Sequence, residues 1–339
     1  MKTERIGYID AMRGFTMILV VYSHICSMCF GNAWMGWNDV FFLFRLPCFF
    51  FISGWLFEHV GRQWDTITIK QTIRHKFMVQ IVPTVIFLLL LAPPPFFFHQ
   101  LGAVKGGYWF TFVLFEFFVL YMLIVRLGNK WGPWITLVIT IGTFYYASYY
   151  HSIQQSAFGI QSWVVNILGF LSVTQWRFFL FFYIGTLVRR HFDSFIYWTN
   201  KPVVLLFITV VFLMIASTPH FESRLFEMLR FYVSGITGMW MVFTTFRLSA
   251  SWLQKLHLSK PLQYVGTRTL DIYLLHFFFL PRFLETYTSQ LKAFDSQFLE
   301  FLVIMAISLI ILALCLLASY VIRLSPFLGH YLFGVKYDK

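Results

Sequence analysis

The sequence predicts an all-α protein, a polytopic transmembrane helix bundle of about ten spans with both termini in the cytoplasm. Three observations support this class. The 339-residue chain is 59% hydrophobic and contains 44 phenylalanines. Only 12% of its residues are charged, whereas about 25% is usual for a soluble domain. Apolar stretches of membrane-spanning length, about 17–25 residues each, follow one another along the whole chain.

Polar breaks separate the expected spans and give one integral-membrane domain over residues 1–339. Pro93-Pro94-Pro95, at the end of the third span, is interpreted as a helix terminator. Residues 151–173 stay open between a loop and a re-entrant or interfacial helix. The first span has no small-residue cleavage site after it and is expected to be retained. The spans are expected at residues 11–30, 38–58, 76–98, 107–126, 132–150, 174–190, 202–218, 227–247, 268–289 and 297–322.

The basic residues support this topology. With the N-terminus in the cytoplasm, most Lys and Arg residues fall in cytoplasmic segments, as the positive-inside rule requires. The net charge of +12 therefore mainly reflects topology. The basic residues form no contiguous patch, so no nucleic-acid partner is expected. The exceptions, on the opposite side, are Lys105, Arg224, Arg230, Arg282 and Lys292.

All four cysteines lie in expected spans. Two of them form a CxxC sequence, but without the βαβ context of a redox motif. We expect all four to pack as small buried apolar residues, and no metal site is predicted. They are Cys26, Cys29, Cys48 and Cys315.

The first span carries two ionisable residues, Arg13 and His24, on one face. Eleven helical steps of about 100° return to within roughly 20° of the same direction, about 16 Å further along the axis. Burying a cation at the centre of a membrane helix costs roughly 2.5–3.5 kcal/mol, so such residues usually face an interior cavity and act there. Arg13 and His24 are therefore the first candidates for chemistry.

The second span combines Arg45, Pro47 and Ser53. Pro47 can kink the helix, and Ser53-Gly54 offers a hydroxyl and a point of close helix approach. Arg45 needs an anion or a wet path. It either binds substrate or pairs with Asp39, about a turn and a half away, in a kinked packing helix.

Two further spans carry polar residues on apolar helices. Trp109 and Glu116 share a face of the fourth span; Trp109 is a candidate interfacial anchor, and a membrane-embedded carboxyl needs a partner or a proton. In the ninth span, Thr269, Tyr273 and His276 form one polar stripe. Asp271 points away from it and is expected to pair with Arg268 in a structural role.

A cytoplasmic basic cluster precedes the third span and contains Arg74 and Lys76. Arg and Lys bind phosphate with charge-assisted hydrogen bonds, so the cluster can hold the phosphates of a nucleotide-like cofactor. It can equally contact anionic lipid as ordinary inside-loop charge. The sequence leaves both readings open.

Taken together, these motifs resemble the membrane-bound acyltransferase 3 family, in particular fucose 4-O-acetylase-like enzymes that modify bacterial surface glycans. The resemblance rests on Tyr8-Ile9-Asp10, Arg13-Gly14 with His24, and the Phe-Phe-Phe-Ile-Ser53-Gly54 run after Pro47. It continues through the basic run before Pro83, Trp109-Phe110 and Thr269-x-x-x-Tyr273-Leu-Leu-His276. The chain departs from the family at Val79, Arg45 and Thr269, which puts the substrate more in doubt than the chemistry.

The resemblance implies a multi-pass O-acyltransferase of the bacterial cytoplasmic membrane, with His24 catalytic and Arg13 its companion. The donor would be acyl-CoA, expected to be acetyl-CoA and not permanently bound; the acceptor would be a glycan or lipid-linked sugar. Expected partners are thus the bilayer, acyl-CoA and the acceptor, and a homo-oligomer stays open. Candidate substrate-binding residues are Asp10, Arg45, Ser53, Trp109, Glu116, Tyr273 and His276, with Arg74 and Lys76 for the donor. The alternative is a transporter whose pathway uses the same intramembrane Arg, His and Glu residues.

Overall fold

The computed structural model describes residues 6–31, 34–59, 61–91, 105–199, 201–219 and 221–335, and every regular element in these ranges is a helix. The predicted all-α class is therefore confirmed. Among the described residues, five helices are long and apolar enough to cross a membrane, or up to seven if each bent pair is one span. These helices support a membrane protein, while ten spans and cytoplasmic termini stay predictions.

Several helices match the predicted spans closely. The first, second, fourth and tenth spans correspond to α1 (Gly7–Met28), α2 (Asn38–Phe57), α6 (Trp109–Leu127) and α17 (Gln297–Arg323). The third helix begins earlier than predicted, because Asp65 caps it by accepting a hydrogen bond from the Thr68 N–H. It continues without a break through α3 (Thr66–Lys76), η1 (Phe77–Ile81) and α4 (Val82–Leu91). Pro93-Pro94-Pro95 lies outside the described residues.

The ninth predicted span, 268–289, is wrong in its length. Helix α15 (Thr269–Phe279) has 11 residues and ends where Leu280 is extended, with φ −67° and ψ 118°. Pro281 explains this break, because a proline disfavours the helical conformation in the residue before it. The chain then continues in η5 (Arg282–Tyr287) and α16 (Thr288–Lys292).

Residues 151–173, left open by the sequence, are mostly helical. Helix α7 (Gly132–Ser156) extends into this segment, and α8 (Ile160–Phe170) follows a turn at Gly159, whose φ is +54°. Helix α8 and the following η4–α9 helix form a pair bent by 49°. The bounds of the other elements are η2 (Lys105–Gly107), η3 (Asn129–Trp131), η4 (Val173–Phe178), α9 (Phe179–Arg190), α10 (Phe192–Thr199), α11 (Pro202–Ala216), α12 (Arg224–Leu248), α13 (Ala250–Lys255), α14 (Ser259–Thr267) and α18 (Pro326–Phe333).

The helices form two compact units that interleave along the chain. The first unit comprises Met1–Ile52, Asp193–His220 and Leu229–Leu324, and the second comprises Ser53–Phe192, Phe221–Met228 and Ser325–Lys339. Helices α2 and α12 each contribute residues to both units. The single domain expected from the sequence stays a prediction.

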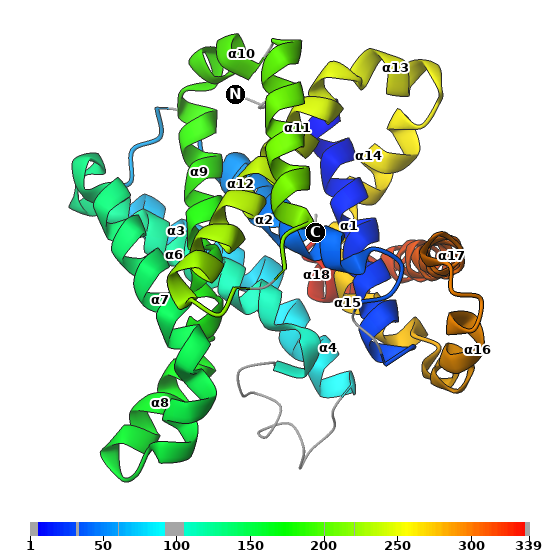
Figure 1. Cartoon of the computed structure of the whole chain (residues 1–339). Helices are drawn as coiled ribbons and strands as arrows, with labels where there is room; N and C mark the ends of the chain where they lie inside the picture. The colour runs from blue at the N-terminus through cyan, green and yellow to red at the C-terminus, as the bar shows by residue number, and fades with distance from the viewer. Residues whose placement is uncertain are drawn as a thin grey trace. The chain divides into compact units, whose positions relative to one another are not determined.

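In the first unit, α1 packs against α14, α15 and α17. Figure 1 shows α1 (blue) beside α14 (yellow). Two glycines make this crossing possible: a Cβ on Gly14 would collide with the Leu262 carbonyl, and one on Gly266 with the Asp10 carbonyl. The two backbones therefore touch directly, which fixes α1 against the helix that leads into α15.

A similar contact occurs in the second unit. A Cβ on Gly54 would collide with the backbone carbonyl of Phe182 on α9, which confirms the predicted close approach at Ser53-Gly54. The core around it is aromatic: Phe57 stacks on Phe118 with ring centroids 4.4 Å apart. The prediction for the cysteines is also confirmed, since all four are buried and free.

Candidate active site

Helix α1 positions the two ionisable residues of the first span. It is continuous from Gly7 to Met28, so Arg13 and His24 share the helix face expected from their spacing. Both side chains are partly exposed, as is that of Asp10. The neighbouring residues of α1 are mostly buried, and the core of the first unit therefore holds this face in place.

His24 meets His276 of α15. Nδ1 of His24 lies 2.8 Å from Nε2 of His276, a hydrogen-bonding distance. The two rings are stacked, with centroids 4.9 Å apart and planes 10° from parallel. Phe277 covers the His24 ring with a centroid separation of 5.1 Å. The structure thus brings together two residues that the sequence placed in separate candidate groups.

The hydrogen bonds around the pair determine where its protons lie. Nδ1 of His276 is 3.1 Å from the Ile272 carbonyl, which can only accept, so Nδ1 carries the hydrogen. In neutral His276, Nε2 is then an acceptor and receives the hydrogen on Nδ1 of His24. Neutral His24 consequently has its free lone pair on Nε2. That nitrogen forms no hydrogen bond within the described part of the chain.

The two histidines differ in exposure. His276 is completely buried, whereas His24 is partly exposed. The lone pair therefore belongs to the more accessible ring, and the buried ring supports it from behind. Tyr273, 7% exposed, packs near His276 with ring centroids 5.9 Å apart. Thr269, on the same predicted stripe, is 2% exposed.

Arg45 of α2 lies near this pair, and its hydrogen-bond partner is Asn38, not Asp39. Its Nη1 donates to Asn38 Oδ1 at 3.1 Å, and Asn38 Nδ2 donates to Ser23 Oγ at 3.3 Å. Pairing with Asp39 is wrong: Asp39 is exposed, and Arg45 is 8% exposed. Helix geometry explains this, because seven residues return to within about 20° of one direction whereas six point away.

The connection between α1 and α2 is held by a carboxylate that sequence reasoning missed. Glu300 of α17, 8% exposed, accepts a hydrogen bond from the Gly36 N–H at 2.9 Å. The Tyr22 hydroxyl donates to the Gly36 carbonyl at 2.6 Å. An acidic residue in the first turn of the most apolar span was a usable signal for Glu300. Asn38 could have been found from its spacing to Arg45.

The other predicted site residues belong to the second unit. Glu116 accepts a hydrogen bond from Trp176 Nε1 at 2.7 Å, which supplies the partner that a membrane carboxyl requires. Trp109 stacks on Phe178 with ring centroids 6.4 Å apart. Arg74 is exposed, Ser53 is partly exposed, and Lys76 lies 4.5 Å from the Phe118 ring centroid.

A further buried cluster in this unit was also missed. Arg190 Nε lies 3.1 Å from Glu58 Oε1, and Tyr121 donates its hydroxyl hydrogen to the same carboxylate. The cluster connects the end of α2 to α6 and α9. Its charges are paired, which is typical of a structural network.

The described residues include no group of three or more His, Cys, Asp or Glu side chains placed to hold a metal ion. The Ile272 carbonyl, the Phe277 ring and Arg45 lie around the histidine pair. The imidazole rings can take up a proton or act as nucleophiles.

Comparison with protein families identifies the family of this chain. The acyltransferase domain model of the acyltransferase 3 family matches residues 6–320, nearly the whole chain. The chain belongs to the acyltransferase 3 family. The match includes both α1 and α15, and with the apolar helices it identifies a membrane acyltransferase. Comparisons with curated proteins and with solved structures returned no match. The acyltransferase 3 resemblance expected from the sequence is confirmed.

Proposed function

We propose that this acyltransferase transfers an acyl group, in the first instance acetyl, from acyl-CoA to a sugar hydroxyl of a surface polysaccharide or lipid-linked glycan. The observation that carries the proposal is the geometry of His24. Its Nδ1 is engaged by His276, its Nε2 has no partner among the described residues, and its side chain is partly exposed. A neutral imidazole with an accessible lone pair suits a general base near physiological pH.

The reaction balances with no redox partner. Nε2 of His24 takes the proton of the sugar hydroxyl while the hydroxyl oxygen attacks the thioester carbonyl carbon. The C–S bond then breaks, and CoA leaves as a thiolate that receives the proton from His24. Alternatively, Nε2 first attacks the thioester carbonyl carbon, the C–S bond breaks and CoA leaves as a thiolate. The sugar hydroxyl oxygen then attacks the acyl carbon, the C–N bond to Nε2 breaks, and the hydroxyl proton passes to the CoA thiolate. Both routes use the same lone pair.

Other residues have proposed supporting roles. Arg45, a buried cation near His24, suits stabilisation of the oxyanion that develops on the thioester carbonyl. Arg13, on the face of His24 but nearer the N-terminus of α1, would orient the donor. Asp10 and Tyr273 are proposed to contact substrate.

The remaining candidates are residues of the second unit. Arg74 is exposed and would bind CoA phosphates together with Lys76. Ser53, Trp109 and Glu116 remain candidates for the acceptor side. We place the protein in the bacterial cytoplasmic membrane, with the donor presented from the cytoplasm.

The test is release of free CoA by purified, detergent-solubilised protein supplied with acetyl-CoA and a polysaccharide extract. His24→Ala and His24→Gln should lose the signal while eluting as folded protein of unchanged size. Radiolabelled acetyl-CoA without acceptor separates the two routes, because only the acyl-enzyme route labels the protein. Wild-type CoA release by His24→Ala would contradict the assignment of His24. Solute movement in vesicles with no CoA release would favour the transporter.

A further inference from the structure

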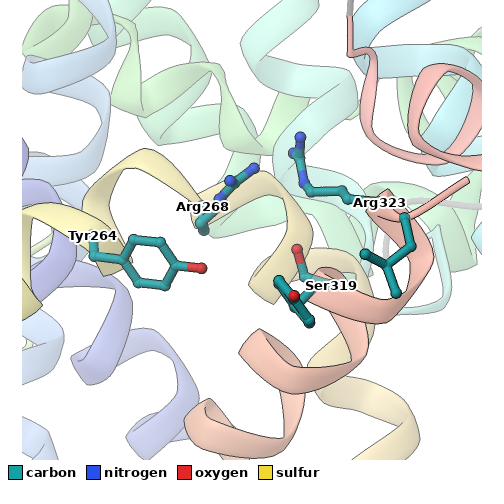
Figure 2. A pocket seen from close by; sticks show the side chains of 6 residues that line it. Tyr264, Arg268, Ser319 and Arg323 are labelled. Atoms are coloured by element: carbon teal, nitrogen blue, oxygen red, sulfur yellow. The ribbon is translucent and has the colours of Figure 1, made fainter. Parts of the chain in front are cut away.

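A pocket lies in the first unit where α15 begins and α17 ends. It has a volume of about 210 Å³ and is lined by Tyr264, Arg268, Ser319, Tyr320, Arg323 and Leu324. Figure 2 shows Tyr264 and Arg268 on one side of this pocket and Ser319 and Arg323 on the other. None of these residues takes part in the proposed acyl transfer, so the pocket needs its own explanation.

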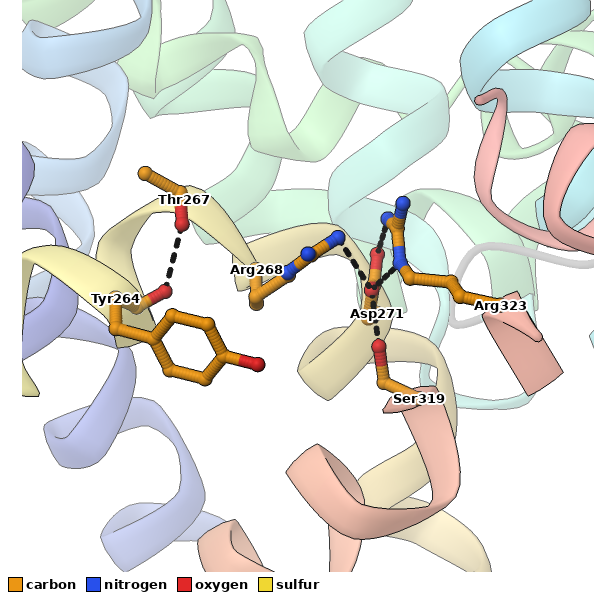
Figure 3. A network of polar contacts seen from close by, with 6 residues as sticks. All are labelled: Tyr264, Thr267, Arg268, Asp271, Ser319 and Arg323. Atoms are coloured by element: carbon orange, nitrogen blue, oxygen red, sulfur yellow. Dashed lines mark hydrogen bonds and ion pairs between the residues drawn. The ribbon is translucent and has the colours of Figure 1, made fainter. Parts of the chain in front are cut away.

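One carboxylate serves both arginines. Asp271 accepts hydrogen bonds from Nε and Nη2 of Arg323 at 2.8 and 2.9 Å, and from the Ser319 hydroxyl. Figure 3 shows this network joining α15 to α17. The pairing of Asp271 with Arg268, expected from the sequence, exists only as a long contact of 4.0 Å. The main partner of Asp271 is Arg323.

Arg268 therefore keeps its hydrogen-bond donors. Its guanidinium forms no hydrogen bond with any residue that the structure describes, and its side chain is 29% exposed. Two guanidinium groups and one carboxylate leave the pocket with a net positive charge. The planar N–H fork of an arginine matches the oxygen atoms of a phosphate.

The position of the pocket favours a lipid headgroup as the source of a bound phosphate. Arg323 is the last residue of α17, a helix long and apolar enough to cross the membrane. The end of such a helix lies at the level of the lipid headgroups. Tyr264 and Tyr320 are 46% and 61% exposed, and exposed tyrosines are enriched at this level of a membrane protein. Leu324 adds an exposed apolar side chain beside them.

We propose that this pocket binds the headgroup phosphate of an anionic phospholipid. Arg268 is the principal ligand, Arg323 contributes charge while it stays paired with Asp271, and the two tyrosines contact the glycerol region. A phosphate held by Arg268 stabilises the start of α15, the helix that carries His276. This site is separate from the proposed catalysis and stands whether or not His24 is the base.

The test measures lipid retained by the purified full-length protein, by native mass spectrometry and thermal unfolding. Wild type is compared in phosphatidylglycerol, in phosphatidylcholine, and in phosphatidylcholine with millimolar inorganic phosphate. The variant is Arg268→Gln, which replaces a guanidinium that forms no hydrogen bond with the residues that the structure describes. The matched control is Lys260→Gln, which removes an exposed charge of α14 outside the pocket.

We expect wild type to retain phosphatidylglycerol preferentially and to unfold at a higher temperature with it. Loss of one cation near a headgroup is worth about 1 kcal/mol, or roughly a fivefold weaker retention. Arg268→Gln should lose at least this much phosphatidylglycerol retention. The change in the logarithm of retention for Lys260→Gln should be less than about half of that for Arg268→Gln. The proposal is overturned if the two variants retain phosphatidylglycerol equally. It is also overturned if the wild type retains phosphatidylglycerol and phosphatidylcholine equally. If inorganic phosphate in phosphatidylcholine stabilises the wild type as much as phosphatidylglycerol does, the lipid is not the source of the bound phosphate.

Discussion

Nδ1 of His24 lies 2.8 Å from Nε2 of His276, although 252 residues separate them in the chain. The Ile272 carbonyl, 3.1 Å from Nδ1 of His276, fixes the direction of the hydrogen bonds. The buried imidazole thereby selects the tautomer of the accessible one. In the proposed reaction, His276 is therefore a positioning residue that acts through His24.

His276→Leu should reduce kcat by about 10²–10⁴-fold, because loss of the group that sets a catalytic tautomer costs up to about 10⁴ in the Ser-His-Asp triad. His276→Gln, whose amide oxygen can accept near the former Nε2, should recover part of this rate. KM for acetyl-CoA should change little in both. The measurement is steady-state CoA release. Equal rates for the two variants would contradict the positioning role and leave only packing.

The crossing of α1 and α14 gives a stability prediction. Gly14→Ala would place a Cβ against the Leu262 carbonyl, and a backbone atom cannot move aside as a side chain can. We expect a loss of roughly 1–3 kcal/mol or more in the free energy of unfolding.

Gly142 in α7 offers the matched control for this substitution. No described atom beyond the adjacent residues and the local backbone of α7 lies within 4 Å of a Cβ built there, so Gly142→Ala should be neutral or stabilising; alanine is favoured over glycine in helices by about 1 kcal/mol. Thermal unfolding in detergent compares the two variants. Similar midpoints would show that the helices separate easily at Gly14.

The sequence predicted on which helix faces the candidate residues lie, but not which of these faces meet. Helical spacing placed His24 on an inward face of the first span and His276 on a polar stripe of the ninth. A helical period says which side of a helix faces inward, but not which two inward faces meet. The contact between His24 and His276 depends on the α1–α14 crossing at Gly14 and Gly266, which involves backbone atoms and carries no polar signature.

Errors of prediction also have local causes. Leu280 and Pro281 end α15 early, and the hydrophobic composition beyond them hid that break. Arg45 pairs with Asn38 instead of Asp39. Asp39 has the charge opposite to that of Arg45, but Asn38 lies on the same helix face as Arg45. Lys105 was counted only as a charge outside the membrane, yet it is 1% exposed.

Lys105 gives a pH-dependent prediction. Its Nζ donates to the Phe170 carbonyl at 2.6 Å and to the Ser172 hydroxyl. Burial lowers the pKa of Lys105 to about 8, and the Glu116 carboxyl offsets part of this effect. An unfolded lysine has a pKa near 10.4, so between about pH 8 and pH 10.4 the unfolded chain binds more protons. Stability from this group should therefore rise with pH through that window.

The measurement is the unfolding midpoint of wild type minus that of Lys105→Met, from pH 7 to pH 10.5. Subtraction removes the contribution of other groups that titrate in this range. The difference should be flat below about pH 8 and should rise above it. A difference independent of pH would mean that Lys105 titrates normally.

Arg45 tests the proposed oxyanion role against a structural one. Its side chain is 8% exposed, and its hydrogen bond to Asn38 leaves other N–H donors of the guanidinium for a ligand. Arg45→Lys keeps the charge and loses the fork, so kcat should fall by about 10²–10³-fold, as for removal of one oxyanion donor. Asp39→Asn, on an exposed residue that does not pair with Arg45, should leave the rate within about twofold, because surface substitutions change little. CoA release and the unfolding midpoint are measured together. A fall in the midpoint with unchanged kcat in Arg45→Lys would assign Arg45 to packing, whereas a fall in kcat at an unchanged midpoint supports its role at the reacting carbonyl.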